Sequence, residues 1–289
     1  MSKITEIMSL IEFPAEACEF FEEMYKNISE NKENSALLQY VCDLYYEKFN
    51  SEELEEKLNE LAEKSGYHRF SVDQLMLLLC GVKLYDLYEQ KGYSKEMCTH
   101  TLRDLTYKMN KCKKIHNIWG NFVLLWYDFF FKLERFAIGR LQYELSTIRF
   151  DYKDILKAGD PILSVHIPAS GPLLEEDVKA SLKAAYEFFG PNYGDKLMLR
   201  CNSWMLYPKT AELFAPGSNM RKFYDLFDII YSEEDKNNHD LWRIFYVPKV
   251  EEDYSNLPQE TSLQKAIYKY IKDGNYMGNG YGIITYKPE

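Results

Sequence analysis

Residues Val165-His-Ile-Pro-Ala-Ser-Gly-Pro-Leu173 show the end of a strand, a turn and the start of a helix. The apolar run Ile162–Ile167 indicates a short buried strand. The turn is Ala169-Ser-Gly171, and Pro172 can take the first helical position, where its missing N–H has no partner to lose. The helix is predicted to run from Pro172 to Phe189 and to stop at Gly190-Pro191. This strand–turn–helix indicates that a sheet packed with helices forms the second half of the chain.

The turn of this segment is also a candidate anion site. Free backbone N–H groups and the dipole at a helix start can bind a pyrophosphate, and Gly171 would let such a ligand approach the backbone closely. The acidic residues Glu175, Glu176 and Asp177 would repel a phosphate, however, and only one glycine is present. A plain capped helix is therefore the alternative interpretation, and spacing alone favours it.

The rest of the second half alternates between predicted strands and helices. Phe136–Leu145 ends in a polar–apolar alternation, which is a strand signal and puts Arg140, Gln142 and Glu144 on one face. Glycines before Gly282 predict a turn ahead of the last strand. The other predicted strands are Lys196–Leu206, Leu241–Val247 and Gly282–Tyr286, and the other predicted helices are Lys209–Phe214, Asn219–Leu226 and Ser262–Asp273.

The first half of the chain is predicted to be entirely helical. Apolar residues recur at helical spacing through it, as in Asn34–Tyr46. Ser51, Ser71 and Ser94 are candidate helix caps, because a serine hydroxyl can accept from a free N–H of the first turn. The prediction is an α+β protein with a helical domain at 1–130 and a mixed α/β domain at 131–289.

Composition excludes several functional classes. The net charge is −10, whereas a surface that follows phosphates needs clustered positive charge, so no nucleic-acid partner is expected. The six cysteines form no CxxC pair, so we expect no metal site. The start of the chain lacks a secretory pattern and no apolar run is long enough to span a bilayer. We expect a cytoplasmic protein with reduced thiols and no membrane partner.

Four side chains are candidates for chemistry. His166 could act as a general base near neutral pH, or it could be a hydrogen-bonded structural histidine. Glu144 could accept a proton from an amine nucleophile, or it could form an ion pair on its strand. Cys201 and Ser203 share one face of a strand, but no GxSxG elbow or second motif supports covalent catalysis. A hydrolase or transferase using Cys201 or His166 is the least favoured hypothesis.

Four stretches together resemble a bacterial family of acyltransferase-domain proteins. In that family a helical N-acyltransferase N-terminal domain precedes a domain like the Gcn5-related N-acetyltransferases (GNAT). The resemblance covers nearly the whole chain and implies a GNAT-like fold, acetyl-CoA or another acyl-CoA as co-substrate, and a small-molecule or peptide amine as acceptor. The stretches are FAIGRLQYEL (136–145), VHIPASGPL (165–173), CNSWML (201–206) and WRIF (242–245).

The resemblance also implies where the site lies. GNAT enzymes hold the CoA pyrophosphate on backbone N–H groups between a central strand and the next helix, which here is Pro168, Ala169, Ser170 and Gly171. The turn lacks the glycine-rich motif of that family. Two central strands, here those of His166 and Cys201, splay apart in GNAT folds. A strand glutamate often serves as base, which favours Glu144, with His166 as the other candidate. Residues expected to bind the substrate are Arg140, Gln142, Cys201 and Ser203.

The alternative to an enzyme is a sensor or scaffold that has kept the fold and lost the donor site. The single glycine of the turn and the acidic helix start favour it. In that case the helical half would be a surface for a protein partner.

Overall fold

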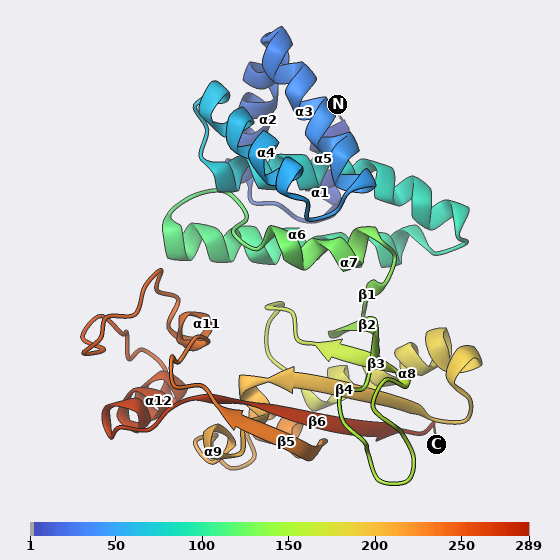
Figure 1. Ribbon diagram of the computed structural model, residues 1–289, viewed down its shortest axis with the longest axis vertical. Helices are drawn as coiled ribbons and strands as arrows, with labels where there is room; N and C mark the ends of the chain where they lie inside the picture. The colour runs from blue at the N-terminus through green and yellow to red at the C-terminus, as the bar shows by residue number, and fades with distance from the viewer. Residues whose placement is uncertain (1–2, 289) are drawn as a thin grey trace. The chain divides into compact units, whose positions relative to one another are not determined.

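The computed structural model describes residues 3–288, and the chain divides into two compact units, Met1–Ala137 and Ile138–Glu289. The first unit is built from helices, and the second is a sheet with helices packed on it (Figure 1). The predicted class, a helical first half followed by a mixed α/β half, is therefore confirmed.

Helix starts in the first unit follow local capping. The Ser51 hydroxyl accepts from the N–H of Leu54, and the Ser94 hydroxyl accepts from the N–H of Met97, as predicted. The prediction for Ser71 was wrong, because the imidazole of His68 caps this helix earlier and the Ser71 hydroxyl donates to the Trp119 carbonyl instead. The elements are α1 (Lys3–Leu10), α2 (Ala15–Glu30), α3 (Lys32–Glu47), α4 (Glu52–Ser65), α5 (Arg69–Gln90), α6 (Lys95–His116), η1 (Leu124–Tyr127) and α7 (Asp128–Phe131).

The second unit contains a mixed sheet with the strand order β1-β2-β3-β4-β6-β5. Strands β3 and β4 are parallel, whereas the β2–β3, β4–β6 and β5–β6 pairs are antiparallel. The strands are β1 (Arg135–Ile138), β2 (Leu141–Thr147), β3 (Pro161–His166), β4 (Leu197–Ser203), β5 (Asp228–Glu234) and β6 (Gly278–Tyr286).

The parallel strands β3 and β4 part toward their carboxyl ends. In the described part of the chain they pair only at Leu163–Leu199 and Ser164–Arg200. β3 continues to His166, and β4 stays paired to β6 as far as Ser203. The splaying of these two strands, which the resemblance implied, is therefore present in the register, and it begins just before His166.

Helix α8 (Glu175–Tyr193) packs on β2 and β4 and covers one face of the sheet. Buried Ser181 fixes the helix to the β1–β2 turn, because its hydroxyl donates to the Ile138 carbonyl and accepts from the Leu141 N–H. The predicted start at Pro172 was wrong, since a separate loop occupies residues 167–174. The predicted stop was also wrong, because Pro191 lies in the last turn of the helix, where the lost N–H bond removes little.

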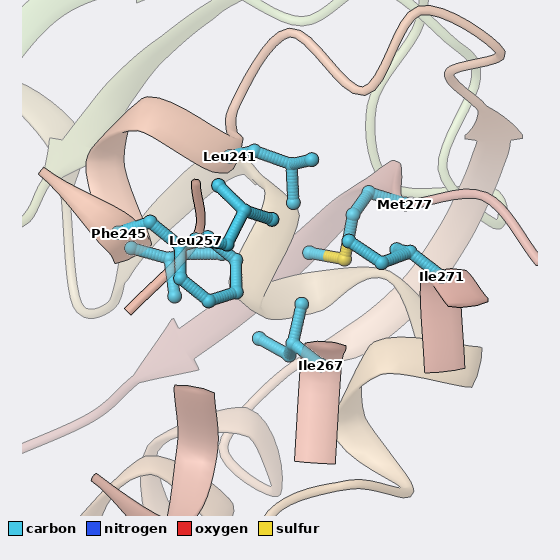
Figure 2. Packing of buried hydrophobic residues seen from close by; sticks show 7 residues of the cluster. Leu241, Phe245, Leu257, Ile267, Ile271 and Met277 are labelled. Atoms are coloured by element: carbon cyan, nitrogen blue, oxygen red, sulfur yellow. The ribbon is translucent and has the colours of Figure 1, made fainter. Parts of the chain in front are cut away.

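The segment predicted as a strand at 241–247 is a short helix, α11 (Leu241–Phe245). Its apolar residues have helical spacing, and they pack against α12 (Ser262–Lys272). Figure 2 shows this cluster, in which side chains of both helices converge with Met277. A short apolar run does not by itself distinguish a buried strand from a buried helix. The remaining elements are η2 (Trp204–Leu206), α9 (Pro208–Ala211) and α10 (Asn219–Tyr224).

Gly274 lies in a turn before β6, as predicted, whereas Gly278, Gly280 and Gly282 lie inside the strand. β6 begins at Gly278, whereas the prediction began the strand at Gly282. A Cβ on Gly280 would overlap the Leu206 carbonyl, and a Cβ on Gly282 would come within 2.9 Å of the Cβ of Phe227. These glycines are therefore needed because other backbone and side chains cross directly over the strand.

Strand β5 was not predicted, and it forms one edge of the sheet. Most of its residues are exposed, so it lacks the buried alternation that reveals a strand in sequence. Its end carries the exposed carboxylates of Glu233 and Glu234.

Candidate active site

Glu144 and His166 form a hydrogen-bonded pair on neighbouring strands. The antiparallel register of β2 and β3 sets His166 opposite Gln142 and Glu144 opposite Ser164, so all four side chains share one face of the sheet. The Nε2 atom of His166 lies 2.9 Å from Oε2 of Glu144. Glu144 is buried and His166 is half-buried. The two candidate bases of the sequence are thus one unit, located where β3 and β4 part.

The arrangement of this pair suits proton transfer. With Glu144 ionised, the carboxylate can only accept, so Nε2 of His166 would donate to it. In that tautomer the ring lone pair is on Nδ1. A carboxylate in this position also stabilises the imidazolium that forms after the transfer.

The same face of the sheet carries further polar groups, of which Gln142 was predicted from the sequence and Ser164 and Arg200 were not. Arg200 pairs with Ser164 in the parallel register, and its Nη2 donates to the Ser146 hydroxyl at 2.6 Å. Ser164 and Gln142 are both buried. The signal was present, because the alternation that puts Cys201 on one face of its strand puts Arg200 on the other.

The loop between β3 and α8 is held by a single side chain. The guanidinium of Arg140 donates to three carbonyls, those of Pro168 at 3.1 Å, Gly171 at 2.6 Å and Pro172 at 2.9 Å. Arg140 thus stabilises the turn that the family resemblance associates with CoA, and it gives that turn a positive charge.

Gly171 and the acidic helix start have local explanations. Gly171 has φ of 117°, a conformation that other residues rarely adopt, and a Cβ there would enter open space. Ala169 and Ser170 beside it are exposed. Glu175 at the start of α8 forms ion pairs with Lys179 at 2.7 Å and Lys222 at 3.0 Å. These hydrogen bonds lower the pKa of the exposed Glu175 carboxyl to about 2, so it stays ionised at neutral pH. The positive charges of the two lysines offset its repulsion of an anion.

Cys201 and Ser203 lie on the opposite face of the sheet from His166. Arg200 shares a face with Ser164 and His166, and strand alternation turns Cys201 and Ser203 the other way. Cys201 is fully buried opposite Gly282, and Ser203 caps the following turn by accepting from the Met205 N–H. A Cys–His pair between Cys201 and His166 is therefore not formed.

The burial of Cys201 predicts an inert thiol. Burial raises the pKa of the Cys201 thiol to about 12, so almost no thiolate exists at neutral pH. Incubation of the folded protein with iodoacetamide at pH 8, followed by peptide mass spectrometry, should label half-buried Cys42 well before Cys201. The denatured protein is the matched control, and in it both thiols should be labelled at equal rates. Rapid labelling of Cys201 in the folded protein would contradict the buried placement.

Metal-ligating clusters and membrane-spanning helices are both absent from residues 3–288. No group of three or more His, Cys, Asp or Glu side chains is placed to hold a metal ion. Among the same residues, every helix is too short or too polar to cross a bilayer.

The parting of β3 and β4, the strand order and the helical unit before the sheet define the class of protein: a helical unit joined to a GNAT-like α/β unit. Residues 136–284 match the family described as "GNAT-like C-terminal domain", and residues 2–133 match "N-acyltransferase N-terminal domain". The chain belongs to this GNAT-like family, and the resemblance seen in the sequence is confirmed. No curated protein matches the chain significantly.

Solved structures share the fold along almost the whole chain. An acyltransferase in complex with decanoyl-CoA and teicoplanin has a TM-score of 0.73 and 18% identity, covering 97% of this chain and 86% of that one. A mutant acyltransferase with octanoyl-CoA has a TM-score of 0.74 and 20% identity, covering 98% and 87%. An acyltransferase with CoA and 10C-teicoplanin has a TM-score of 0.74 and 20% identity, covering 96% and 86%.

Proposed function

We propose that this protein is an acyl-CoA-dependent N-acyltransferase in which the Glu144–His166 pair is the proton acceptor. The observation that carries the proposal is the 2.9 Å contact between these two side chains at the point where β3 and β4 part. Membership of a GNAT-like family supports the reaction class. Structures of similar fold contain CoA or acyl-CoA, which supports the donor.

The reaction forms an amide and releases CoA. The amine nitrogen attacks the thioester carbonyl, a C–N bond forms, and the C–S bond breaks with departure of the CoA thiolate. Nδ1 of His166 takes the proton that the amine loses, and this proton then passes to the thiolate. Glu144 holds the imidazole in the reactive tautomer and stabilises its charged form. The chain supplies orientation of the two reactants in addition to the base.

The donor is expected at the loop between β3 and α8. The backbone N–H groups of Ala169, Ser170 and Gly171 are the proposed ligands of the CoA pyrophosphate, and Arg140 and Lys222 supply positive charge near them. This assignment rests on the position of the loop after β3. Gln142 and Arg200 are proposed to face the acceptor, because they share the face of the sheet that carries His166.

The acceptor is proposed to be an amine on a small molecule or peptide. Two of the structures of similar fold contain teicoplanin or an acylated teicoplanin. The net charge of −10 attracts a cationic amine and repels an anionic one. The acyl chain is proposed to be acetyl or longer.

Isothermal titration of the full chain with CoA, acetyl-CoA, octanoyl-CoA and decanoyl-CoA tests the donor directly. We expect at least one thioester to bind with Kd of ~100 μM or tighter, which is roughly −5.5 kcal/mol. ATP is the matched control, because it carries phosphates without the pantetheine thioester. Absence of binding by every CoA species would overturn the proposal.

Removing the clamp on the donor loop should weaken CoA binding. In the Arg140→Ala variant three carbonyls lose their donor, and the loop at 168–172 gains freedom that binding must then remove. We expect Kd for CoA to rise at least ~10-fold, about 1.4 kcal/mol, with a smaller change in kcat at saturation. Arg149→Ala, in the loop that precedes β3, is the control. Unchanged CoA affinity in Arg140→Ala would show that the clamped loop is not part of the donor site.

A second candidate function is a sensor or scaffold without catalysis. The observation in its favour is the cluster of exposed carboxylates on Glu175, Glu176 and Asp177 at the start of α8. This candidate predicts that CoA species neither bind nor react, whereas a protein partner binds the helical unit. Detection of bound CoA by mass spectrometry in the purified native protein would rule it out.

A further inference from the structure

Two cysteines of the helical unit lie in contact where α3 and α5 pack together. Cys42 belongs to α3, and Cys80 belongs to α5. The Cys80 thiol donates to the Cys42 carbonyl at 3.8 Å, and the two thiols are also hydrogen-bonded to each other. One turn after Cys42, the Tyr46 hydroxyl donates to the Cys80 carbonyl at 2.8 Å. The packing of the two helices therefore holds both sulfurs at one place.

The two thiols differ in their access to solvent. Cys42 is half-buried, whereas Cys80 is 2% exposed. Burial, and after it the hydrogen bond with Cys42, raises the pKa of the Cys80 thiol well above its usual value. Because a cysteine reacts as the thiolate, Cys80 is a poor first nucleophile, and Cys42 is the sulfur that a reagent can reach.

Cys42 opens into a pocket of the helical unit. The pocket has a volume of about 490 Å³, within the usual range for small-molecule sites, and both cysteines line it. Apolar side chains of α1, α3 and α5 form part of its walls. Four exposed charged side chains also line it, Lys3 and Lys83 with Asp43 and Asp86. Since the two signs of charge balance, a small zwitterionic molecule can enter without net repulsion.

Cys18 provides an internal comparison. It is also half-buried, and its thiol donates to the Phe13 carbonyl at 3.8 Å. Burial, and after it the carboxylates of Glu22 and Glu19, raises the pKa of the Cys18 thiol. The groups that act on Cys18 are therefore carboxylates, whereas the group in contact with Cys42 is a second thiol.

We propose that Cys42 and Cys80 form a dithiol site for a low-molecular-weight disulfide, with Cys42 as the attacking sulfur and Cys80 as the resolving sulfur. The Cys42 thiolate attacks one sulfur of the disulfide, a mixed disulfide forms at Cys42, and the first thiol leaves with the proton that Cys42 lost. The Cys80 sulfur then attacks the Cys42 sulfur, and the second thiol leaves with the proton of Cys80. Two protein thiols are oxidised to one disulfide, and one external disulfide is reduced to two thiols.

The product is a covalent link between α3 and α5. A disulfide joins two sulfurs at ~2.05 Å, so only residues on adjacent backbones can form one. Residues 42 and 80 are on adjacent backbones, because the Cys80 sulfur contacts the carbonyl of Cys42. The chemistry uses no residue of the proposed acyltransferase site, so the two proposals stand or fall separately.

Incubation of the reduced full chain with oxidised glutathione at pH 8, followed by intact and peptide mass spectrometry, tests the proposal. The parent should lose two hydrogens and give a peptide linked through Cys42 and Cys80, with glutathione on Cys42 only as an early species. In Cys80→Ala the mixed disulfide at Cys42 should accumulate to at least ~10-fold its level in the parent, because no second thiol resolves it. Cys42→Ser should acquire no glutathione at Cys80. Cys18 should stop at the mixed disulfide.

Controls keep the test decisive. Thermal unfolding establishes that each variant is folded, and the link in the parent is measured without any variant. Cys18→Ala should form the Cys42–Cys80 link at the rate of the parent. A link that forms only in the denatured protein would overturn the proposal, as would glutathione that persists on Cys42 of the parent as long as in Cys80→Ala. Addition of glutathione to Cys80 in folded Cys42→Ser would overturn the assignment of Cys42 as the attacking sulfur.

Discussion

Replacement of His166 by alanine is expected to lower kcat for acyl transfer by ~10²–10⁴-fold, the usual contribution of a positioned general base. The KM for acyl-CoA should change little, because the proposed role of His166 is to take the proton of the amine and not to bind the donor. The loss should diminish as pH rises, since the fraction of acceptor amine that is already deprotonated increases. Measurement of kcat and KM against pH with the preferred thioester gives this result directly.

The partner carboxylate should show the same dependence in weaker form. Glu144→Gln keeps the shape of the side chain but removes the charge that stabilises the imidazolium 2.9 Å away. We expect a loss of ~10–10³-fold in kcat, and the double variant should be no worse than His166→Ala because the two residues act as one unit.

Cys201→Ala is the control for these variants, because Cys201 is a buried side chain on the other face of the same sheet. It should retain kcat within ~3-fold, a difference below about 0.7 kcal/mol. Additive losses in the Glu144 and His166 double variant, or full activity in His166→Ala, would contradict the proposed pair.

Introduction of a single methyl group at Gly280 should unfold the second unit at a much lower temperature. The added Cβ would overlap the Leu206 carbonyl, which belongs to backbone and cannot rotate away. Forced shifts in a packed core cost about 1–3 kcal/mol and sometimes more, and we expect the upper end for Gly280→Ala. For a domain of this size that lowers Tm by roughly 6–12 °C, measured by differential scanning calorimetry.

Gly190→Ala supplies the matched control for this substitution. Gly190 lies in α8, and a Cβ there would make an ordinary contact of 3.4 Å with the Tyr186 ring. Alanine favours a helix over glycine by ~1 kcal/mol, so the variant should be neutral or slightly more stable. Equal destabilisation by the two substitutions would show that the crossing over Gly280 is not the cause.

The architecture was predictable because the two halves carry different periodicities. Helical spacing and serine caps at Ser51 and Ser94 identified the first half. The alternation in 136–145 identified β2, but the single predicted strand is divided by a turn at Gly139 and Arg140, which separates β1 from β2. Short apolar runs gave no such guidance, since 241–247 forms a helix and the exposed β5 has no alternation at all. Those elements are decided by packing against distant segments, such as α12 for α11.

The candidate site was predictable only as separate residues. The sequence indicated Glu144 and His166 as rival bases. Their contact depends on the register between β2 and β3, in which His166 lies opposite Gln142, the residue two positions before Glu144 on the same face. Arg140 was expected to face substrate, whereas its guanidinium holds three carbonyls of a loop some thirty positions away in the chain. The role of the late glycines is likewise invisible in sequence, because it depends on the turn at 204–206 crossing over β6.

The edge strand β5 can affect the behaviour of the protein at high concentration. The outer edge of such a strand can recruit another strand and begin a fibril. Two copies that pair in parallel and in register along this edge would bring Glu233 of one copy close to Glu233 of the other, and the repulsion opposes the contact. The neighbouring Glu234 is partly offset by its ion pair with Lys209. High salt weakens this repulsion and acid removes it, so edge-to-edge polymerisation of this protein is expected to increase under those two conditions.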